Sequence, residues 1–338
     1  MIQSPVLIIG CPRSGTTLLF NILSEASSLW STGYESKEII EHLHHPSRKN
    51  WESGALDEGD LTPESRAYIL RAFEKSVAPG SFWRKSNRLR SLLRRNPLWR
   101  RVKLHGQSGQ AGSATSSSLP QQGLRLLRTW VRVRNSLLPR DEAVPIRLLE
   151  KTPENCLRLP FLLALFPDAR IIFLTRDGRS NVLSLMEGWR QPHLFPGYRV
   201  PETLRIPGDT RGRWAFTLIP GWRDLVASPL EEVCAWQWIR CNEAVWEHRE
   251  QTRGQVPYLT VRYEALVANP TLELRRIADF IGVEGEPFLR VADALPWINI
   301  VSAPEEEKWR RWNPQSVARI RPLIRPMMDR LGYESSSS

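Results

Sequence analysis

Short, predominantly apolar runs recur along the chain, and most of them precede a segment with a helical pattern. These runs cover residues 6–9, 29–32, 147–149, 170–174 and 257–261. Short apolar runs of this kind are typical of strands buried on both faces, which are mostly parallel strands connected by helices. The pattern predicts an α/β fold in one domain over residues 1–338, with a central parallel sheet of about five strands flanked by helices.

The first apolar run leads into a loop bounded by Gly10 and Gly15. Backbone N–H groups at such a strand–loop–helix junction converge on an anion. The spacing is that of a P-loop, although Thr16 stands where the lysine of that motif would be, and Arg13 supplies a cation inside the loop. A tight turn with a hydroxyl helix cap is the simpler interpretation, but the two glycines and the cation favour a phosphate loop. We therefore expect phosphate contacts from Arg13, Ser14, Gly15, Thr16 and Thr17.

Polar residues follow each of the predicted strands. Ligands of open parallel sheets bind at the carboxyl ends of the strands, so these side chains should meet in one crevice. They are Arg13, Glu35, Lys151, Arg176 and the pair Arg262 and Tyr263. Five such clusters at the same ends of five strands indicate a binding site.

The fourth predicted strand distinguishes between two kinds of phosphate site. A P-loop NTPase requires an aspartate at the end of such a strand to hold Mg²⁺. Here Thr175 and Arg176 come first, and Asp177 is followed by Gly178 and Arg179. The pattern favours a site for anionic groups that needs no metal, with a metal-dependent P-loop kinase of a small metabolite as the alternative.

The charge of the chain favours anionic partners. Its 338 residues carry a formal net charge of +11, which suits a nucleotide, a sulfated acceptor, nucleic acid or a lipid surface. Residues 84–103 are densely basic with Leu and Trp interleaved, and either a membrane contact, a polyanion site or a solvated helix face explains them. A nucleic-acid or anionic-lipid binder without chemistry is therefore a second alternative.

Two further segments and the cysteines complete the outline. Residues 105–123 are rich in Gly, Ser and Gln, which predicts a flexible loop. Residues 191–229 are rich in Pro, Gly and Trp, which predicts a long excursion of the kind that carries acceptor recognition.

The four cysteines show no disulfide framework, and no apolar run of about 18 residues is present. The phosphate loop leaves little room for a leader before it, so we expect a cytoplasmic protein.

Several motifs together resemble a known enzyme family. PRSGTT near the start, EKTP at 150–153 and RDGRSNVLS at 176–184 are similar to motifs of sulfotransferases that use 3′-phosphoadenosine 5′-phosphosulfate (PAPS). The resemblance extends over nearly the whole chain and includes bacterial sulfotransferases and tyrosylprotein sulfotransferases. It implies in-line transfer of a sulfuryl group from PAPS to an acceptor hydroxyl of a saccharide, a lipid-linked sugar or another small molecule. Adenosine 3′,5′-bisphosphate (PAP) is then the product.

The same resemblance implies roles for individual residues. Glu35 is the expected base, with Glu38 as the fallback, and Lys151 is expected to contact the leaving group. It also implies that Arg13 contacts the 5′-phosphate and that Ser302 lies near the transferred sulfonate. The remaining donor contacts are expected from Arg176 and Ser184 at the 3′-phosphate and from Tyr263, Lys308 and Trp309 elsewhere on the nucleotide. No metal and no nucleic-acid partner are expected, and neither the acceptor nor the oligomeric state follows from the sequence.

Overall fold

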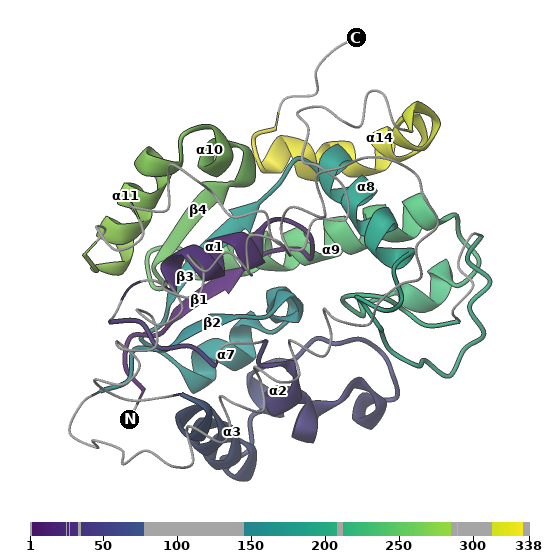
Figure 1. Ribbon diagram of the computed structural model, residues 1–338. Coiled ribbons are helices and arrows are strands. Elements are labelled where there is room, and N and C mark those ends of the chain that lie inside the picture. Colours follow the sequence, from purple (N-terminus) through teal and green to yellow (C-terminus); the bar gives the residue numbers. More distant parts are fainter. Residues whose placement is uncertain are drawn as a thin grey trace, which may run out of the picture.

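A four-stranded parallel sheet forms the centre of the molecule (Figure 1). The computed structural model describes residues 2–24, 26, 28–32, 35–77, 145–207, 212–284, 289 and 313–333. Within them the strand order is β2-β1-β3-β4. The strands are β1 (Val6–Ile9), β2 (Leu149–Lys151), β3 (Arg170–Thr175) and β4 (Tyr258–Arg262).

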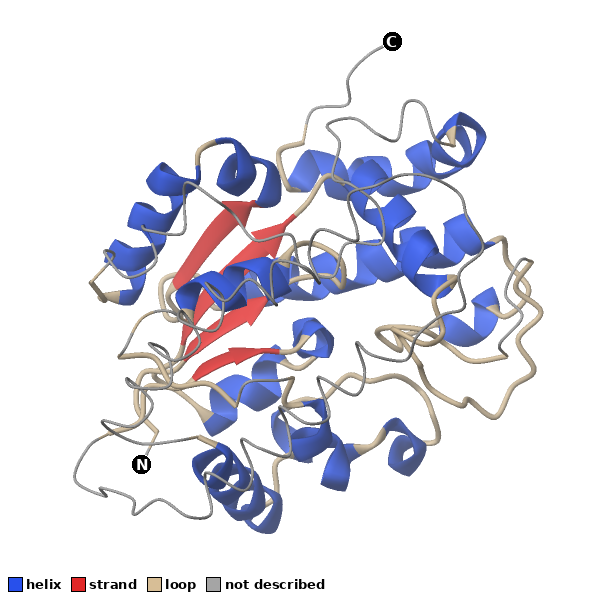
Figure 2. Cartoon of the chain, viewed as in Figure 1, coloured by secondary structure: helices blue, strands red, loops and turns tan. Residues whose placement is uncertain are grey.

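Side chains alternate between the two faces of the sheet, so each face has its own apolar cluster. Leu7 and Ile9 of β1 belong to one cluster, and Val6 and Ile8 belong to the other. Both faces are covered, which is why the strands are apolar throughout. Figure 2 shows the strands enclosed between helices.

The helices divide between these two faces. The face that carries Val6 and Ile8 packs against α1 (Thr16–Leu23), α10 (Tyr263–Ala268) and α11 (Pro270–Ile281). The opposite face packs against α2 (Lys37–His44), α3 (Pro63–Ser76), α7 (Leu159–Leu165), α8 (Gly178–Trp189), α9 (Leu230–Gln251) and α14 (Pro314–Arg330). Short 3-10 turns are η1 (Pro46–Lys49), η2 (Glu58–Asp60), η3 (Pro153–Leu157) and η4 (Trp222–Leu225).

The predicted α/β class with a central parallel sheet is confirmed, but the predicted strand at 29–32 is wrong. Only Trp30 pairs with the sheet, through a single parallel bridge to Leu148 beside β2. Its N–H donates to Arg147 O, and its carbonyl accepts from Leu149 N–H. The chain then leaves the sheet edge, because the N–H of Ser36 donates to the Thr152 side chain instead of to a strand.

Three other boundaries differ from the predicted ones. β2 begins at Leu149 instead of 147, so Lys151 is part of the strand. The helix predicted at 156–165 is divided at Arg158, whose φ of −127° lies outside the helical region. The helix α8 begins at Gly178 instead of 180, because the Asp177 carboxylate accepts from the N–H groups of Arg179 and Ser180.

The predicted excursion after α8 is irregular and well anchored. Trp214 lies edge-on to Trp189 and to Trp222, with ring centroids 5.5 Å apart in both pairs. Gln237 of α9 donates from Nε2 to the carbonyl oxygens of Ala215 and Thr217. All of these tryptophans are fully buried, so they belong to the core.

Some predicted features lie outside the described residues. They are the basic stretch 84–103, the loop 105–123, and the candidate site residues Ser302, Lys308 and Trp309. Among the described helices, none combines the length and the apolar character that crossing a membrane requires. All four cysteines are free and buried, as the lack of a disulfide framework predicts.

Candidate active site

The loop after β1 is shaped by close contacts at its two glycines. A Cβ at Gly10 would lie 2.5 Å from the carbonyl oxygen of Leu174. Gly15 has a φ of 100°, and a Cβ there would lie 2.5 Å from the ring of Tyr263. Only glycine fits both positions, and Gly15 directly precedes the first residue of α1, Thr16. The loop therefore presents the open N-terminus of a helix, where N–H groups are free to bind an anion.

Arg13 adopts an uncommon conformation in the middle of this loop. Its φ is 71°, a left-handed value that is unusual for a residue other than glycine. Its Nε donates to Ser184 Oγ at 3.2 Å, and its guanidinium carbon lies 5.1 Å from the centroid of the Phe195 ring. Burial, and to a lesser degree the charge of Arg176, lowers the pKa of Arg13 to about 10. A bound anion would offset this desolvation cost.

Arg176 holds the loop from the end of β3. Its Nη1 donates to the carbonyl oxygen of Arg13 at 2.8 Å, and its guanidinium lies 4.6 Å from the centroid of the Tyr263 ring. Its own carbonyl oxygen accepts from Trp238 Nε1 at 3.3 Å. The structure thus brings together four of the predicted site residues: Arg13, Arg176, Ser184 and Tyr263.

Two buried hydrogen-bond donors near the loop have no partner among the described residues. They are Ser14 Oγ and Arg176 Nε. Buried donors are normally satisfied, so these two atoms are available to a ligand. Together with the two guanidinium groups and the helix N-terminus, they fit a ligand that carries phosphate or sulfate groups.

A carboxylate–ammonium pair lies at the end of the neighbouring strand. Lys151 Nζ donates to Glu35 Oε1 at 2.6 Å. The lysine side chain is 5% exposed, whereas that of the glutamate is 42% exposed. Lys151 lies opposite Ile8 in the sheet, and Gly10 follows two residues later, so the pair is adjacent to the loop. Glu38, the fallback, is exposed on the first turn of α2.

The sequence profile of the sulfotransferase family matches residues 5–193, which include the loop, Glu35, Lys151, Arg176 and Ser184. The chain belongs to the sulfotransferase family. A protein-tyrosine sulfotransferase of Drosophila melanogaster is 24% identical to this chain over 207 residues. That match covers 56% of the chain and 35% of the fly protein, so the chain spans about a third of this relative.

Solved structures of sulfotransferases are also similar to this chain. One from Mycobacterium avium has a TM-score of 0.47 and 17% identity, covering 100% of this chain and 79% of that one. One from Alicyclobacillus acidocaldarius has a TM-score of 0.42 and 14% identity, covering 96% and 97%. A mouse sulfotransferase complexed with PAP has a TM-score of 0.41 and 10% identity, covering 96% and 84%.

One predicted member of the polar cluster lies away from the site. Arg262, at the end of β4, donates from Nη2 to the carbonyl oxygens of Leu331 and Gly332 and lies over the ring of Tyr333. Its side chain therefore fastens the end of α14 to the sheet. Strand-end position alone did not distinguish this structural arginine from the two at the loop.

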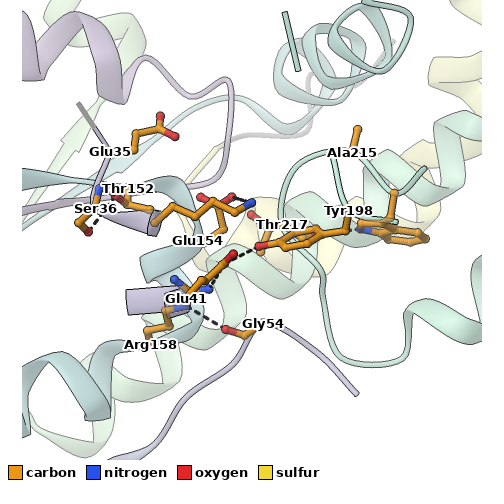
Figure 3. A network of polar contacts seen from close by, with 12 residues as sticks. Glu35, Ser36, Glu41, Gly54, Thr152, Glu154, Arg158, Tyr198, Ala215 and Thr217 are labelled. Atoms are coloured by element: carbon orange, nitrogen blue, oxygen red, sulfur yellow. Dashed lines mark hydrogen bonds and ion pairs between the residues drawn. The ribbon is translucent and has the colours of Figure 1, made fainter. Parts of the chain in front are cut away.

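A buried polar network beside Glu35 was not expected from the sequence (Figure 3). Tyr198 OH and Arg158 Nη2 both donate to Glu41 Oε1 at 2.6 Å. Lys37 Nζ donates to Glu154 at 2.8 Å and lies 3.7 Å from the centroid of the Tyr198 ring. Burial opposes the charge of Lys37, but Glu154 raises its pKa above the usual range. The network connects α2, η3 and the excursion, so it fixes the excursion next to the Glu35 segment.

Proposed function

We propose that this sulfotransferase moves a sulfuryl group from PAPS to an acceptor hydroxyl, with Glu35 as the general base. The observation that carries the proposal is the 2.6 Å contact between Lys151 and Glu35 beside the anion-binding loop. An acceptor base and a cation at the leaving group are what in-line transfer requires from the protein, and here they touch.

The donor would be held by its two anionic ends. PAPS carries a 5′-phosphosulfate and a 3′-phosphate. The loop N–H groups of Gly15, Thr16 and Thr17, the Ser14 hydroxyl and the Arg13 guanidinium are proposed to bind the 5′ end. Arg176 and Ser184 are proposed to bind the 3′-phosphate. Both residues are hydrogen-bonded to Arg13, so the groups that bind the two ends of the donor would be directly connected.

The remaining nucleotide contacts are assigned by the family resemblance and by one close approach. The ring of Tyr263 lies against Gly15 and under Arg176, which favours contact with the nucleotide. Lys308 and Trp309 are proposed to close over the donor, and Ser302 to approach the sulfonate, although all three lie outside the described residues.

In the reaction, Glu35 removes the proton of the acceptor hydroxyl as its oxygen forms a bond to sulfur. The bond from sulfur to the bridging oxygen of PAPS breaks, and that oxygen leaves with both electrons on PAP. Lys151 and Arg13 stabilise the charge that develops on the bridging oxygen and the sulfonate. The proton ends on Glu35, from which solvent removes it because the side chain is 42% exposed.

The acceptor is a hydroxyl of a saccharide, a lipid-linked sugar or another small molecule, recognised by the excursion at 191–229. The fly relative is named for protein tyrosine, which is also a hydroxyl acceptor. Tyr198 of the excursion contacts Glu41 and Lys37 of α2, the helix that follows Glu35. The excursion is therefore close to the Glu35 segment.

The test measures transfer of the label from ³⁵S-labelled PAPS to a panel of phenols and sugars. Where no acceptor on the panel is used, it measures hydrolysis of PAPS, with water as the acceptor and PAP as the product. Glu35→Gln should lower turnover about 10²- to 10⁴-fold, the usual contribution of a general base. PAP affinity should stay within about twofold, because the base acts on the acceptor and not on the donor. Glu38→Gln is the matched control and should keep wild-type turnover. Full turnover by the Glu35 variant would refute this assignment of the base.

A further inference from the structure

Two hydroxyl groups next to the Glu35–Lys151 pair make uncommon contacts. Ser36 precedes α2 and Thr152 precedes η3, positions at which a serine or threonine hydroxyl normally accepts from the first turn. Neither side chain makes such a capping contact. The absence of these capping contacts costs helix stability, so we expect other partners for the two hydroxyl groups.

Both hydroxyl groups are directed to the same buried carboxylate. Ser36 Oγ and Thr152 Oγ1 each donate to Glu150 Oε1 at 2.6 Å. Asn155 Nδ2 donates to the other oxygen, Oε2, at 2.8 Å. Ser36, Thr152 and Asn155 are fully buried and Glu150 is 2% exposed, so solvent does not contribute to this cluster.

The cluster also fixes the backbone that carries Glu35. Thr152 Oγ1 accepts from the N–H of Ser36 at 2.7 Å while its own proton goes to Glu150. Glu35 itself belongs to no helix or strand, so no ladder holds it. Figure 3 shows Ser36 and Thr152 side by side, with the Glu35 side chain directed away from them.

Two neighbouring pairs of residues therefore cross between the same two segments. Glu35 meets Lys151, and Ser36 meets Glu150, over a sequence separation of 114 to 116 residues. The first pair faces the proposed reaction centre, and the second is buried behind it. Successive residues of a strand point to opposite sides of the sheet. Lys151 therefore contacts Glu35 on one side, and Glu150 contacts Ser36 on the other.

We infer that Glu150, acting through Ser36 and Thr152, is a positioning residue that holds Glu35 in its catalytic place. The inference rests on the proposed role of Glu35. Glu150 is buried behind the proposed reaction centre and contacts neither substrate; it fixes the main chain from which the base projects. A misplacement of about 1 Å costs about 10²-fold in rate when a reacting group is displaced, so such a residue affects turnover strongly.

The geometry of Asn155 suggests a conservative variant. Glu150→Gln keeps a carbonyl oxygen for Ser36 and Thr152, but its amide would face the Asn155 amide. Asn155 Oδ1 has no partner among the described residues, so rotation of the Asn155 amide would supply an acceptor. Glu150→Gln should therefore keep the position of Glu35, whereas Glu150→Ala leaves three donors without an acceptor.

The experiment is a double-mutant cycle between positions 35 and 150. Turnover of ³⁵S-labelled PAPS is measured with the fastest acceptor of the phenol and sugar panel, or with water, and PAP affinity is measured by calorimetry. Glu150→Ala should lower kcat about 10- to 100-fold with PAP affinity within about twofold, and Glu150→Gln should restore kcat to within about threefold. In the Glu35→Gln background, Glu150→Ala should have no further effect on kcat.

The control is Glu273→Ala, which removes another buried carboxylate, one paired with Arg276 on α11 away from the site. It should leave kcat unchanged. If Glu150→Ala does not fold, Ser36→Ala removes one contact to the same carboxylate and should give a smaller loss of kcat with the same cycle. An equal loss of kcat in both backgrounds would show a general structural role and overturn the inference. Unchanged turnover in Glu35→Gln alone would instead overturn the proposed function.

Discussion

At the scale of single residues, the site depends on side chains whose partners are far away in sequence. Arg13 was predicted from its place in the loop, but its left-handed backbone and its contact with Ser184 were not. Arg176 also binds the Arg13 carbonyl oxygen, across 163 residues. Sequence patterns specify residue types at strand ends, whereas tertiary packing decides which way each side chain turns.

Glu150 offers a pH-dependent test at this scale. Burial raises the pKa of its carboxyl above the ordinary 4.5, although three hydrogen bonds and Lys151 act in the opposite direction. The folded protein therefore holds this proton more tightly than the unfolded chain does, so the carboxyl lowers stability as the pH rises from about 4.5 through its raised pKa.

We expect Glu150→Gln, which cannot ionise, to gain stability relative to the wild type over that pH range. The free energy of unfolding in urea, measured for both proteins at a series of pH values, should give a difference that grows with pH and then levels off. A difference that is independent of pH, or that shrinks as the pH rises, would contradict the buried ionisation.

At the scale of elements, the sequence predicted the helices and strands with the strongest patterns. The strands β1, β3 and β4 and the helix α9 lie where the apolar runs and the helical period place them. The run at 29–32 was misleading, because its apolar content reflects burial at the sheet edge and only Trp30 forms a bridge. Local composition cannot tell a buried edge crossing from a strand.

The turn before α1 gives a prediction at this scale. Gly15→Ala would combine left-handed strain with a clash against Tyr263, because φ is 100° and the added Cβ lies 2.5 Å from the ring. Gly282→Ala, after α11, has the same strain at φ 64° but no heavy atom within 4 Å.

The control variant should lose about 1 to 2 kcal/mol of stability and keep PAP binding. Gly15→Ala should lose more stability and also lose PAP binding, because the loop N–H groups move. Thermal unfolding measures the stability of the two variants, and calorimetry measures their PAP affinity. Equal stability and equal PAP affinity would show that the close approach of Tyr263 to Gly15 has no effect on either.

At the scale of the whole molecule, the sheet edge explains why distant segments form one site. The carboxyl ends of β1, β2 and β3 bring the loop, Lys151 and Arg176 together, as the topology rule predicts. The buried networks around Glu150 and Glu41 could not be predicted, because their members are polar residues with no periodic signal. Only the folded chain shows that they hold the Glu35 segment and the excursion.

Calorimetry with PAP shows directly whether this site binds a bisphosphorylated nucleoside, as we propose. The wild-type protein is titrated with PAP in EDTA and, separately, with ATP and Mg²⁺. Arg176→Ala should weaken PAP binding about 10- to 150-fold, the range for loss of a charged hydrogen bond. Arg325→Ala, an exposed arginine on α14, is the control and should bind normally.

We expect micromolar binding of PAP without metal and much weaker binding of ATP with Mg²⁺. Tight binding of ATP with Mg²⁺ and no response to PAP would contradict this expectation and would favour a metal-dependent kinase.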